Sequence, residues 1–327
     1  MATTAQSKPD FGKINTGKLD PCLAVNDWLA DTYRFIQDRV LPPFHWPLFA
    51  NVLETYQANR VTRGVADVDV FPTAACLAVG GTNEQAMPLA ASWSLYIFAG
   101  RLFDDLADGE GGERFNAPTL SSKLSTCLFA VSAANAALAH LVDTEAYESI
   151  ATAFSHAVGL AVKSENTRPT LDQLSLETYF ATIAAKTGII FATGAWAGGR
   201  MGMNRPNETV LTALYRYGLH VGMMTQIIDD CLDIRVDLAN QVWTLPVIYA
   251  FSQETHPLRG QLHELLAYQQ PTESAWLEKV VETLTQTGAI SWSLYFAEIH
   301  RQKAWAAIHD LVPFPGYLRH YVIPKNK

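Results

Sequence analysis

Two short acidic clusters of the same form lie in distant parts of the chain. DDLAD and DDCLD each contribute three carboxylates: Asp104, Asp105 and Asp108, then Asp229, Asp230 and Asp233. Residues i and i+4 share one face of an α-helix, so Asp104 stacks over Asp108 and Asp229 over Asp233. Crowded carboxylates at the end of an apolar helix are costly unless cations neutralise them, and Mg²⁺ prefers carboxylate, water and phosphate oxygens. One such cluster is more often a solvated face, but two in similar contexts predict metal and diphosphate binding.

Helices must position both clusters. The residues before them, SLYIFAGRLF and HVGMMTQII, are apolar in a helical context, which predicts helices over about 86–108 and 207–234. Other helices are expected over about 22–41, 46–61, 119–141, 144–162 and 171–199, with a polar break at KSENTRPT. No segment alternates in the manner of a strand. The sequence therefore predicts an all-α fold of about ten to thirteen helices, in one domain over 22–327 after a flexible tail at 1–21.

Composition excludes several classes of protein. Of the 327 residues, 49% are apolar and 17% charged, which allows a large core. The net charge is −8 and no basic stripe is present, so nucleic-acid binding is not expected. The polar N-terminus lacks an apolar core and no stretch reaches about 18 uninterrupted apolar residues, so neither a signal peptide nor stable membrane insertion is expected. Four scattered cysteines without CxxC spacing fit a reduced, cytoplasmic protein.

Five motifs, in their order and spacing, resemble those of trans-isoprenyl diphosphate synthases and the related class I terpene synthases. They are DDLAD, the Lys-Thr segment AAKTGIIFATGAWAGG, the segment YGLHVGMMTQIIDDCLDI, the triplet Thr244-Leu245-Pro246, and TGAI at 287–290. The resemblance covers roughly residues 46–309. It implies an isoprenoid-synthase-type bundle of antiparallel helices around a deep central cavity, in a family that is commonly homodimeric.

The resemblance also implies roles for individual residues. The six aspartates would hold Mg²⁺, three ions with the substrate diphosphate, which thereby becomes a leaving group. Lys186, on an otherwise apolar helix, needs an anionic partner and matches the diphosphate-binding lysine. Gln226 either contacts the diphosphate or makes a structural hydrogen bond, and Asp105 and Asp230 are either ligands or groups behind the ligands. The residues expected to carry catalysis are Asp104, Asp108, Asp229 and Lys186.

The basic residues that would bind a second diphosphate are mostly missing. Chain-elongating members hold isopentenyl diphosphate on a Gly-Lys-Arg…Arg-Pro segment and an Arg-Arg-Gly pair. Upstream of the first cluster this chain reads RGVADVDVFPTAAC, where Arg63 remains but acids and valines stand at the expected basic positions. Downstream, in GEGGERFNAP, Arg114 stands beside acidic residues and is assigned to the substrate diphosphate. Carboxylates in both places are expected to repel a second diphosphate.

This pattern favours a class I terpene synthase that ionises one prenyl diphosphate and releases a hydrocarbon or alcohol plus diphosphate. Bulky aromatics close the family's cavity at fifteen carbons, where this chain has Ala99 and Gly100. A twenty-carbon substrate, acyclic or already bicyclic, is therefore expected. The alternatives are a trans-prenyl diphosphate synthase of the farnesyl or geranylgeranyl type, its non-catalytic partner subunit, or a helical protein that sequesters prenyl chains.

Overall fold

The computed structural model describes residues 21–63, 66–107, 119–165, 170–267 and 274–322. The predicted N-terminal tail lies outside these ranges, except for Pro21. The described ranges contain no strand, which confirms the all-α prediction, and they contain fourteen α-helices, more than the ten to thirteen expected. The first seven are α1 (Pro21–Phe35), α2 (Pro47–Arg63), α3 (Phe71–Ala78), α4 (Asn83–Ala107), α5 (Leu120–Leu138), α6 (Thr144–Glu165) and α7 (Leu176–Ile183). The others are α8 (Ile189–Gly202), α9 (Glu208–Leu232), α10 (Ile234–Ala239), α11 (Leu245–Ser252), α12 (Arg259–Ala267), α13 (Ser274–Gln286) and α14 (Ala289–Ile308).

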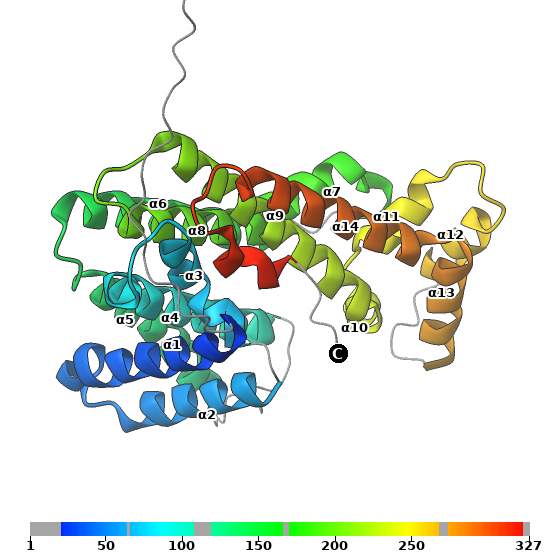
Figure 1. Cartoon of the computed structure of the whole chain (residues 1–327). Helices are drawn as coiled ribbons and strands as arrows, with labels where there is room; N and C mark the ends of the chain where they lie inside the picture. Colours follow the sequence, from blue (N-terminus) through cyan, green and yellow to red (C-terminus); the bar gives the residue numbers. More distant parts are fainter. Residues whose placement is uncertain (1–20, 64–65, 108–118, 166–169, 268–273, 323–327) are drawn as a thin grey trace, which may run out of the picture.

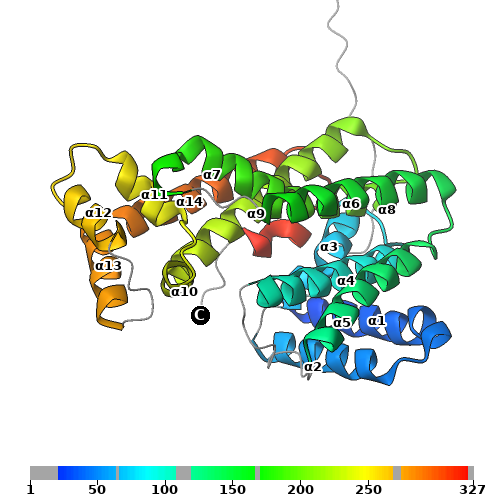
Figure 2. The ribbon, with the colours of Figure 1, turned by 180° about the vertical axis from the view of Figure 1, so that it is seen from behind.

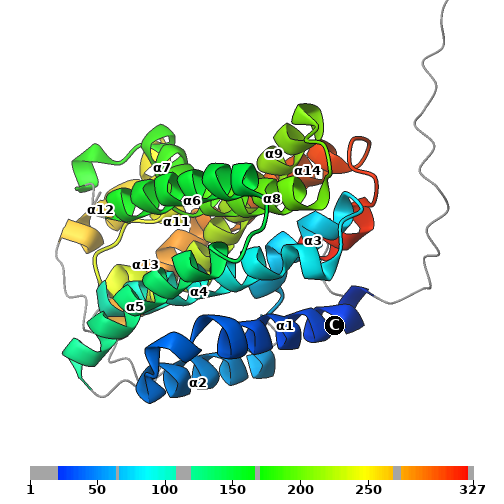
Figure 3. The ribbon, with the colours of Figure 1, turned by 90° about the vertical axis from the view of Figure 1, so that its left-hand side faces the viewer.

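The helices form stacked layers. Figure 3 shows α1 and α2 on one outer side, α4 and α5 in the middle, and α6, α8, α9 and α14 on the other side. Helix α9 packs on both α8 and α14, α4 packs on α5, and α3 joins α8 to α4 (Figure 1). Helices α12 and α13 project to one side of the bundle, away from α1 and α2 (Figure 2). Of the two long helices that carry the acidic clusters, α4 therefore lies in the middle layer, and α9 lies in the next layer, where it packs on α8 and α14.

Local sequence signals fix several helix ends. Thr119 caps α5 in a capping box with Ser122, and the Asn207 side chain accepts hydrogen bonds from the first turn of α9. Small residues then let the central helices approach closely: a Cβ added at Gly218 would lie 2.2 Å from the Phe191 carbonyl oxygen. Any larger residue at this position would push α9 away from α8.

Two segments differ from the sequence prediction. The helix expected over about 171–199 is divided into α7, a π-helical segment (Ala184–Gly188) and α8. Helix α6 continues to Glu165, into the predicted polar break. The stretch Leu176–Gly202 is long and apolar enough to cross a membrane by length and composition. Its contacts with α3, α6 and α9 are those of a core helix.

The remaining connections are short helical turns. A π-helical segment, Ile36–Val40, and a 3₁₀ turn, Pro42–Phe44, join α1 to α2. A second 3₁₀ turn, Ala66–Val70, precedes α3, and a third, Pro315–Tyr321, packs on α3 near the C-terminal end of the described chain. The turn at Ala66–Val70 belongs to the segment in which acids and valines stand in place of the expected basic residues.

Candidate active site

Both acidic clusters end a long helix, as the sequence predicts. Asp104 and Asp105 lie in the last turn of α4, while Asp108 and the predicted substrate ligand Arg114 lie outside the described residues. Asp229 lies in the last turn of α9, and the Asp233 N–H donates to its carbonyl oxygen at 2.8 Å. The expected one-turn spacing of Asp229 and Asp233 is therefore present in the backbone.

The first and second acids of each pair differ in exposure. Asp105 is 8% exposed and Asp230 is 4% exposed, so both are buried. Asp104 is half-buried, and Asp229 is exposed. In both clusters, the first aspartate is thus the one more accessible to a ligand from solution, and the second lies beneath it.

Hydrogen bonds occupy both carboxylate oxygens of Asp230. The Tyr179 hydroxyl donates to Oδ2 at 2.5 Å and the Gln226 amide to Oδ1 at 2.8 Å. The backbone N–H of Leu245, in the Thr-Leu-Pro triplet, also donates to this carboxylate. Burial still raises the pKa of Asp230 above its usual range. This geometry favours the hydrogen-bonding role over direct metal ligation for Asp230, and it connects the Thr-Leu-Pro triplet to the second cluster.

Gln226 links the second cluster to the π-helical segment. Its Oε1 accepts a hydrogen bond from the Thr187 hydroxyl at 2.5 Å, while its Nε2 donates to Asp230. Both ends of the amide are therefore used within the protein. This arrangement favours the structural alternative for Gln226, and its contact with a diphosphate stays a prediction.

Lys186 lies in the π-helical segment, among carboxylates from three helices. Its Nζ is 2.5 Å from Oε2 of Glu165, at the end of α6. Burial lowers the pKa of Lys186, but the charges of Asp104, Glu165 and Asp230 outweigh it and raise that pKa above its usual value. Local π-helical geometry is frequent at functional sites. The lysine expected from the sequence thus lies within electrostatic reach of both clusters.

Sequence reasoning missed two charged residues of the site. Glu165 was assigned to a polar break, where only the continuation of α6 could have identified it. Arg101 lies on α4 three residues before Asp104 and is exposed, and helical spacing alone places the two on one face. The Arg101 charge lowers the pKa of Asp229, which shows that it also lies near the second cluster.

The acids fit a cation. Desolvation by the surrounding protein, followed by the charges of Asp233 and Asp230, raises the pKa of Asp229 to about 6. A nearby cation would relieve that crowding of negative charge. Within the described ranges, no three His, Cys, Asp or Glu residues form a group that could hold a metal ion. An ion here would take its remaining ligands from water or from a substrate, which is usual for Mg²⁺.

The segment expected to repel a second diphosphate is organised differently from the prediction. Asp69 is buried, and its Oδ2 accepts a hydrogen bond from Nε of the buried Arg60 at 2.5 Å. Phe71 is also fully buried and packs against Trp93 and Phe191. The expected repulsion by Asp69 is therefore wrong, because Arg60 neutralises it inside the protein. At positions 69 and 71, the segment therefore offers no positively charged side chain to a ligand, because a buried aspartate and a buried phenylalanine occupy them.

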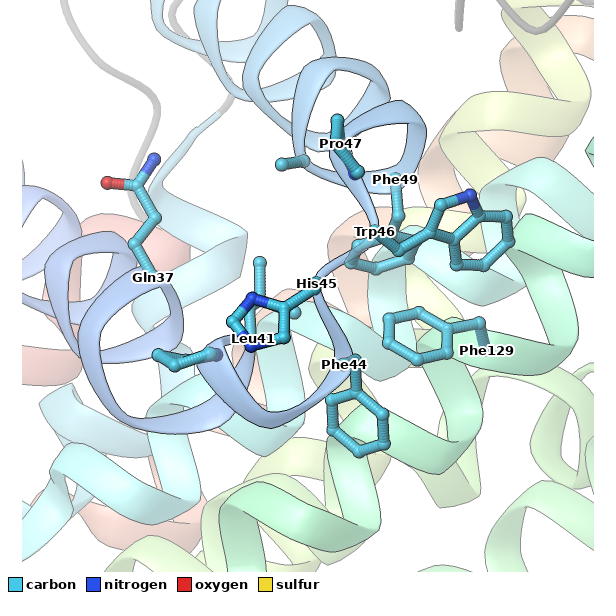
Figure 4. Close-up of a pocket in the computed structure, with 10 residues that line it drawn as sticks. Gln37, Leu41, Phe44, His45, Trp46, Pro47, Phe49 and Phe129 are labelled. Atoms are coloured by element: carbon cyan, nitrogen blue, oxygen red, sulfur yellow. The ribbon is translucent and has the colours of Figure 1, made fainter.

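The space around Ala99 and Gly100 is uneven. A Cβ added at Gly100 would meet no atom within 4 Å. Ala99, in contrast, is buried, and its carbonyl oxygen accepts a hydrogen bond from the Cys127 thiol. Because Gly100 is exposed, the space beside it is open to solvent, and neither position shows the enclosed space that the chain-length expectation requires. A separate surface hollow of about 360 Å³ lies between the turn that joins α1 to α2 and helix α5. Figure 4 shows its aromatic side chains, and none of the predicted site residues lines it.

Comparison with known families decides the group to which the chain belongs. The family model described as polyprenyl synthetase matches residues 75–284. The chain belongs to the polyprenyl synthetase family. The resemblance to trans-isoprenyl diphosphate synthases is thereby confirmed. The comparisons do not show that the chain is a terpene synthase derived from them.

Curated relatives match part of the chain. Component 2 of heptaprenyl diphosphate synthase from Bacillus subtilis is 33% identical over 152 residues, 42% of this chain and 40% of that protein. Octaprenyl diphosphate synthase from Escherichia coli is 31% identical over 150 residues, 42% of this chain and 45% of that protein. The matched regions therefore span less than half the length of these relatives.

Solved structures confirm the isoprenoid-synthase-type fold. A polyprenyl synthase from Caulobacter crescentus, complexed with calcium and isoprenyl diphosphate, has a TM-score of 0.77 at 23% identity and covers 95% of this chain and 98% of that one. Geranylgeranyl pyrophosphate synthetase from Pyrococcus horikoshii has a TM-score of 0.76 at 19% identity, with coverage of 94% and 99%. At these identities the likeness concerns the fold alone.

Proposed function

We propose that this protein is a divalent-metal-dependent enzyme that ionises an allylic prenyl diphosphate. The observation that carries the proposal is the position of Lys186, whose ammonium is influenced by Asp104 on α4 and by Asp230 on α9. A cation between two carboxylate-bearing helix ends suits a diphosphate that is bound through metal ions. Support from relatives comes from the names of prenyl diphosphate synthases and from the Caulobacter crescentus structure with calcium and isoprenyl diphosphate.

The residues would share the work as follows. Mg²⁺, when bound, neutralises the diphosphate and stabilises it as a leaving group. Asp104 and Asp229 are the more accessible acids of their pairs and would hold such ions, together with Asp233 and the undescribed Asp108. The Lys186 ammonium would donate to a diphosphate oxygen, which adds to the stabilisation of the departing charge. Tyr179 and Gln226 hold Asp230 in place by hydrogen bonds, and the negative charge of Asp230 helps to raise the pKa of Lys186.

The allylic carbocation that remains after loss of diphosphate could react in two ways. The relatives are prenyl and polyprenyl diphosphate synthases, and they favour chain elongation with isopentenyl diphosphate, the alternative named from the sequence. The buried Arg60–Asp69 pair and the buried Phe71 favour the other fate, because this segment offers no accessible cation at those positions for a second diphosphate. The comparisons thus favour a trans-prenyl diphosphate synthase. The class I terpene synthase acting on one prenyl diphosphate, which we propose on the ground of these buried positions alone, is the interpretation that the experiments must separate from it.

A further subunit is part of the proposal. One curated relative is named component 2 of a heptaprenyl diphosphate synthase, a name that implies a partner component for that protein. In this chain, Leu120, Leu124 and Leu128 are exposed at one-turn intervals along α5. We assign this stripe to a contact with a second copy of this chain, as in the homodimer expected from the sequence, and a different partner component is the alternative. Sedimentation of the wild-type chain and of Leu124→Glu tests the assignment, since a monomeric wild type would overturn it.

The ionisation step is tested by release of inorganic diphosphate. The purified chain is given farnesyl or geranylgeranyl diphosphate, each with Mg²⁺ and without isopentenyl diphosphate. We expect release that stops when a chelator is added, and that is faster for the twenty-carbon substrate because no bulky aromatic side chain stands at positions 99 and 100. Preference for the fifteen-carbon substrate would overturn the chain-length assignment. No release from either substrate, even with isopentenyl diphosphate present, would overturn the proposed enzyme.

A further inference from the structure

Lys186 has a partner that belongs to neither acidic cluster. Glu165 is the last residue of α6, and its Oε2 lies 2.5 Å from the lysine Nζ. The Glu165 side chain is 20% exposed and the Lys186 side chain 30%, so the pair is partly shielded from water. Such a pair is less screened than one in open solvent. Glu165 therefore fixes the resting position of the ammonium more firmly than a surface partner would.

The lysine has a second carboxylate within electrostatic reach. The charge of Asp104 acts on Lys186 together with that of Glu165. A lysine side chain is a flexible four-carbon stem that carries a compact point charge. Without Glu165, the ammonium would move toward Asp104. There it would neutralise the aspartate and compete with any divalent cation for the carboxylate oxygens.

We propose that Glu165 is a positioning residue that holds Lys186 away from Asp104, so that a divalent cation can reach Asp104 while the ammonium faces the diphosphate. This inference rests on the proposed function of the same site. It adds a third helix, α6, to the two that carry the acidic clusters. Glu165 acts through Lys186 and touches neither the metal nor the reacting atoms.

The chain offers a matched control. Arg235 on α10 and Glu278 on α13 form an ion pair at 2.6 Å, with side chains that are 50% and 61% exposed. The change Glu278→Gln removes the same charge from the same type of residue, in an ion pair at a similar distance. It differs from Glu165→Gln in having no lysine of the site as its partner.

The experiment measures binding of Mg²⁺ with inorganic diphosphate to the full chain by titration calorimetry. We expect Glu165→Gln to raise the half-saturating Mg²⁺ concentration about tenfold, and Glu278→Gln to change it less than about twofold. In a Lys186→Gln background, adding Glu165→Gln should give no further loss. The conservative Glu165→Asp should recover part of the affinity, because it keeps the charge. Melting curves for each variant identify any loss that comes from unfolding.

The outcomes separate the inference from the proposed function. If the wild-type chain binds Mg²⁺ and diphosphate but Glu165→Gln binds equally well, the inference is wrong and the proposed function stands. The inference is also wrong, with the proposed function intact, if Glu165→Gln weakens binding as much in the Lys186→Gln background as in the wild type. If the wild-type chain does not bind Mg²⁺ with diphosphate, both are wrong.

Discussion

Two charged regions of the molecule use similar residues in opposite ways. Where α4 and α9 end, Asp104 and Asp229 remain accessible and a lysine lies among the carboxylates. Where α2 meets the turn that precedes α3, the opposite charges of Arg60 and Asp69 pair with each other and are buried. The first arrangement leaves charge accessible to a ligand. In the second arrangement, each charge is neutralised by its partner inside the protein. Separating a buried ion pair is strongly destabilising, so neither side chain is available to a ligand.

On the proposed function, accessible charge, and not the number of charged residues, decides where a diphosphate binds. In the first region, burial and then the neighbouring carboxylates raise the pKa of Asp229, and a bound cation would offset that crowding of negative charge. The second region would have to separate Arg60 from Asp69 before it could offer a cation. Mutations on either side of this contrast should have different consequences.

The largest effect is expected on the acidic side. Asp104→Asn and Asp229→Asn should each lower Mg²⁺-dependent diphosphate release at least about 10³-fold, because electrostatic stabilisation of the leaving group depends on the bound ion. Steady-state kinetics with a prenyl diphosphate measures the loss. Asp310→Asn is the control, since Asp310 is exposed and outside both clusters. A residual activity above about a tenth in both variants would remove the acids from the mechanism.

On the buried side, the expected effect is on stability. Asp69→Asn should lower the free energy of unfolding by about 3–5 kcal/mol, because it leaves the Arg60 guanidinium buried without its counter-charge. Urea titration measures this loss, and the double change Arg60→Leu with Asp69→Leu should recover much of it. Diphosphate release per folded molecule should stay within a few-fold of wild type. If activity falls while stability is unchanged, this pair belongs to the site and the contrast is lost.

The contact between α9 and α14 is expected to make the stability of the fold depend on pH. His220 on α9 and His300 on α14 face each other with their Nδ1 atoms 3.1 Å apart. Burial, His220 and Lys303 lower the pKa of His300 to about 4, and burial, Lys303 and Arg216 lower that of His220.

Because folding lowers these pKa values below 6.5, the unfolded chain takes up protons first as the pH falls. The stability contributed by the neutral rings is present above pH 6.5 and is lost toward pH 4, by about 3 kcal/mol for His300. Urea titrations of the wild type and His300→Gln between pH 7 and 4 measure it. The variant should show the smaller loss, and equal slopes would contradict the assignment.

The smallest effect is expected at the support of the second cluster. Tyr179→Phe removes the hydroxyl that donates to Asp230 and should destabilise the fold by about 2 kcal/mol, the scale of a hydrogen bond to a charged group. Tyr215→Phe is the control, because Tyr215 is exposed on α9. Thermal unfolding gives the difference. An unchanged melting temperature for Tyr179→Phe would show that Asp230 does not depend on this bond.

The sequence predicted those features that depend on local patterns. Apolar periodicity gave the long helices α4 and α9, Asn207 marked the start of α9, and short motifs gave the acids and Lys186. Contacts between residues that lie far apart in the sequence were not predictable. Helix α6 continues to Glu165, and the Glu165 side chain forms an ion pair with Lys186 in a later helical segment. The π-helical segment is joined to α9 through Thr187, which no local propensity can show.

The same limit explains the errors at the second-diphosphate segment. The acid at Asp69 was visible in the sequence, but its partner Arg60 lies on another helical element, so the charge was expected to face a ligand. The number of helices was underestimated because short elements such as α10 give too few turns for a clear periodicity. Roles that rest on Asp108 and Arg114 stay predictions, since both lie outside the described residues.

Product analysis distinguishes the ionisation of one diphosphate from the joining of two. The chain is incubated with Mg²⁺ and geranylgeranyl diphosphate, with and without isotopically labelled isopentenyl diphosphate, and the products are identified by mass spectrometry. We expect diphosphate release and an unlabelled hydrocarbon or alcohol in both mixtures, with no label in a longer diphosphate. A product that forms only when isopentenyl diphosphate is present, and that carries the label, would contradict the terpene synthase proposal and identify a chain-elongating synthase.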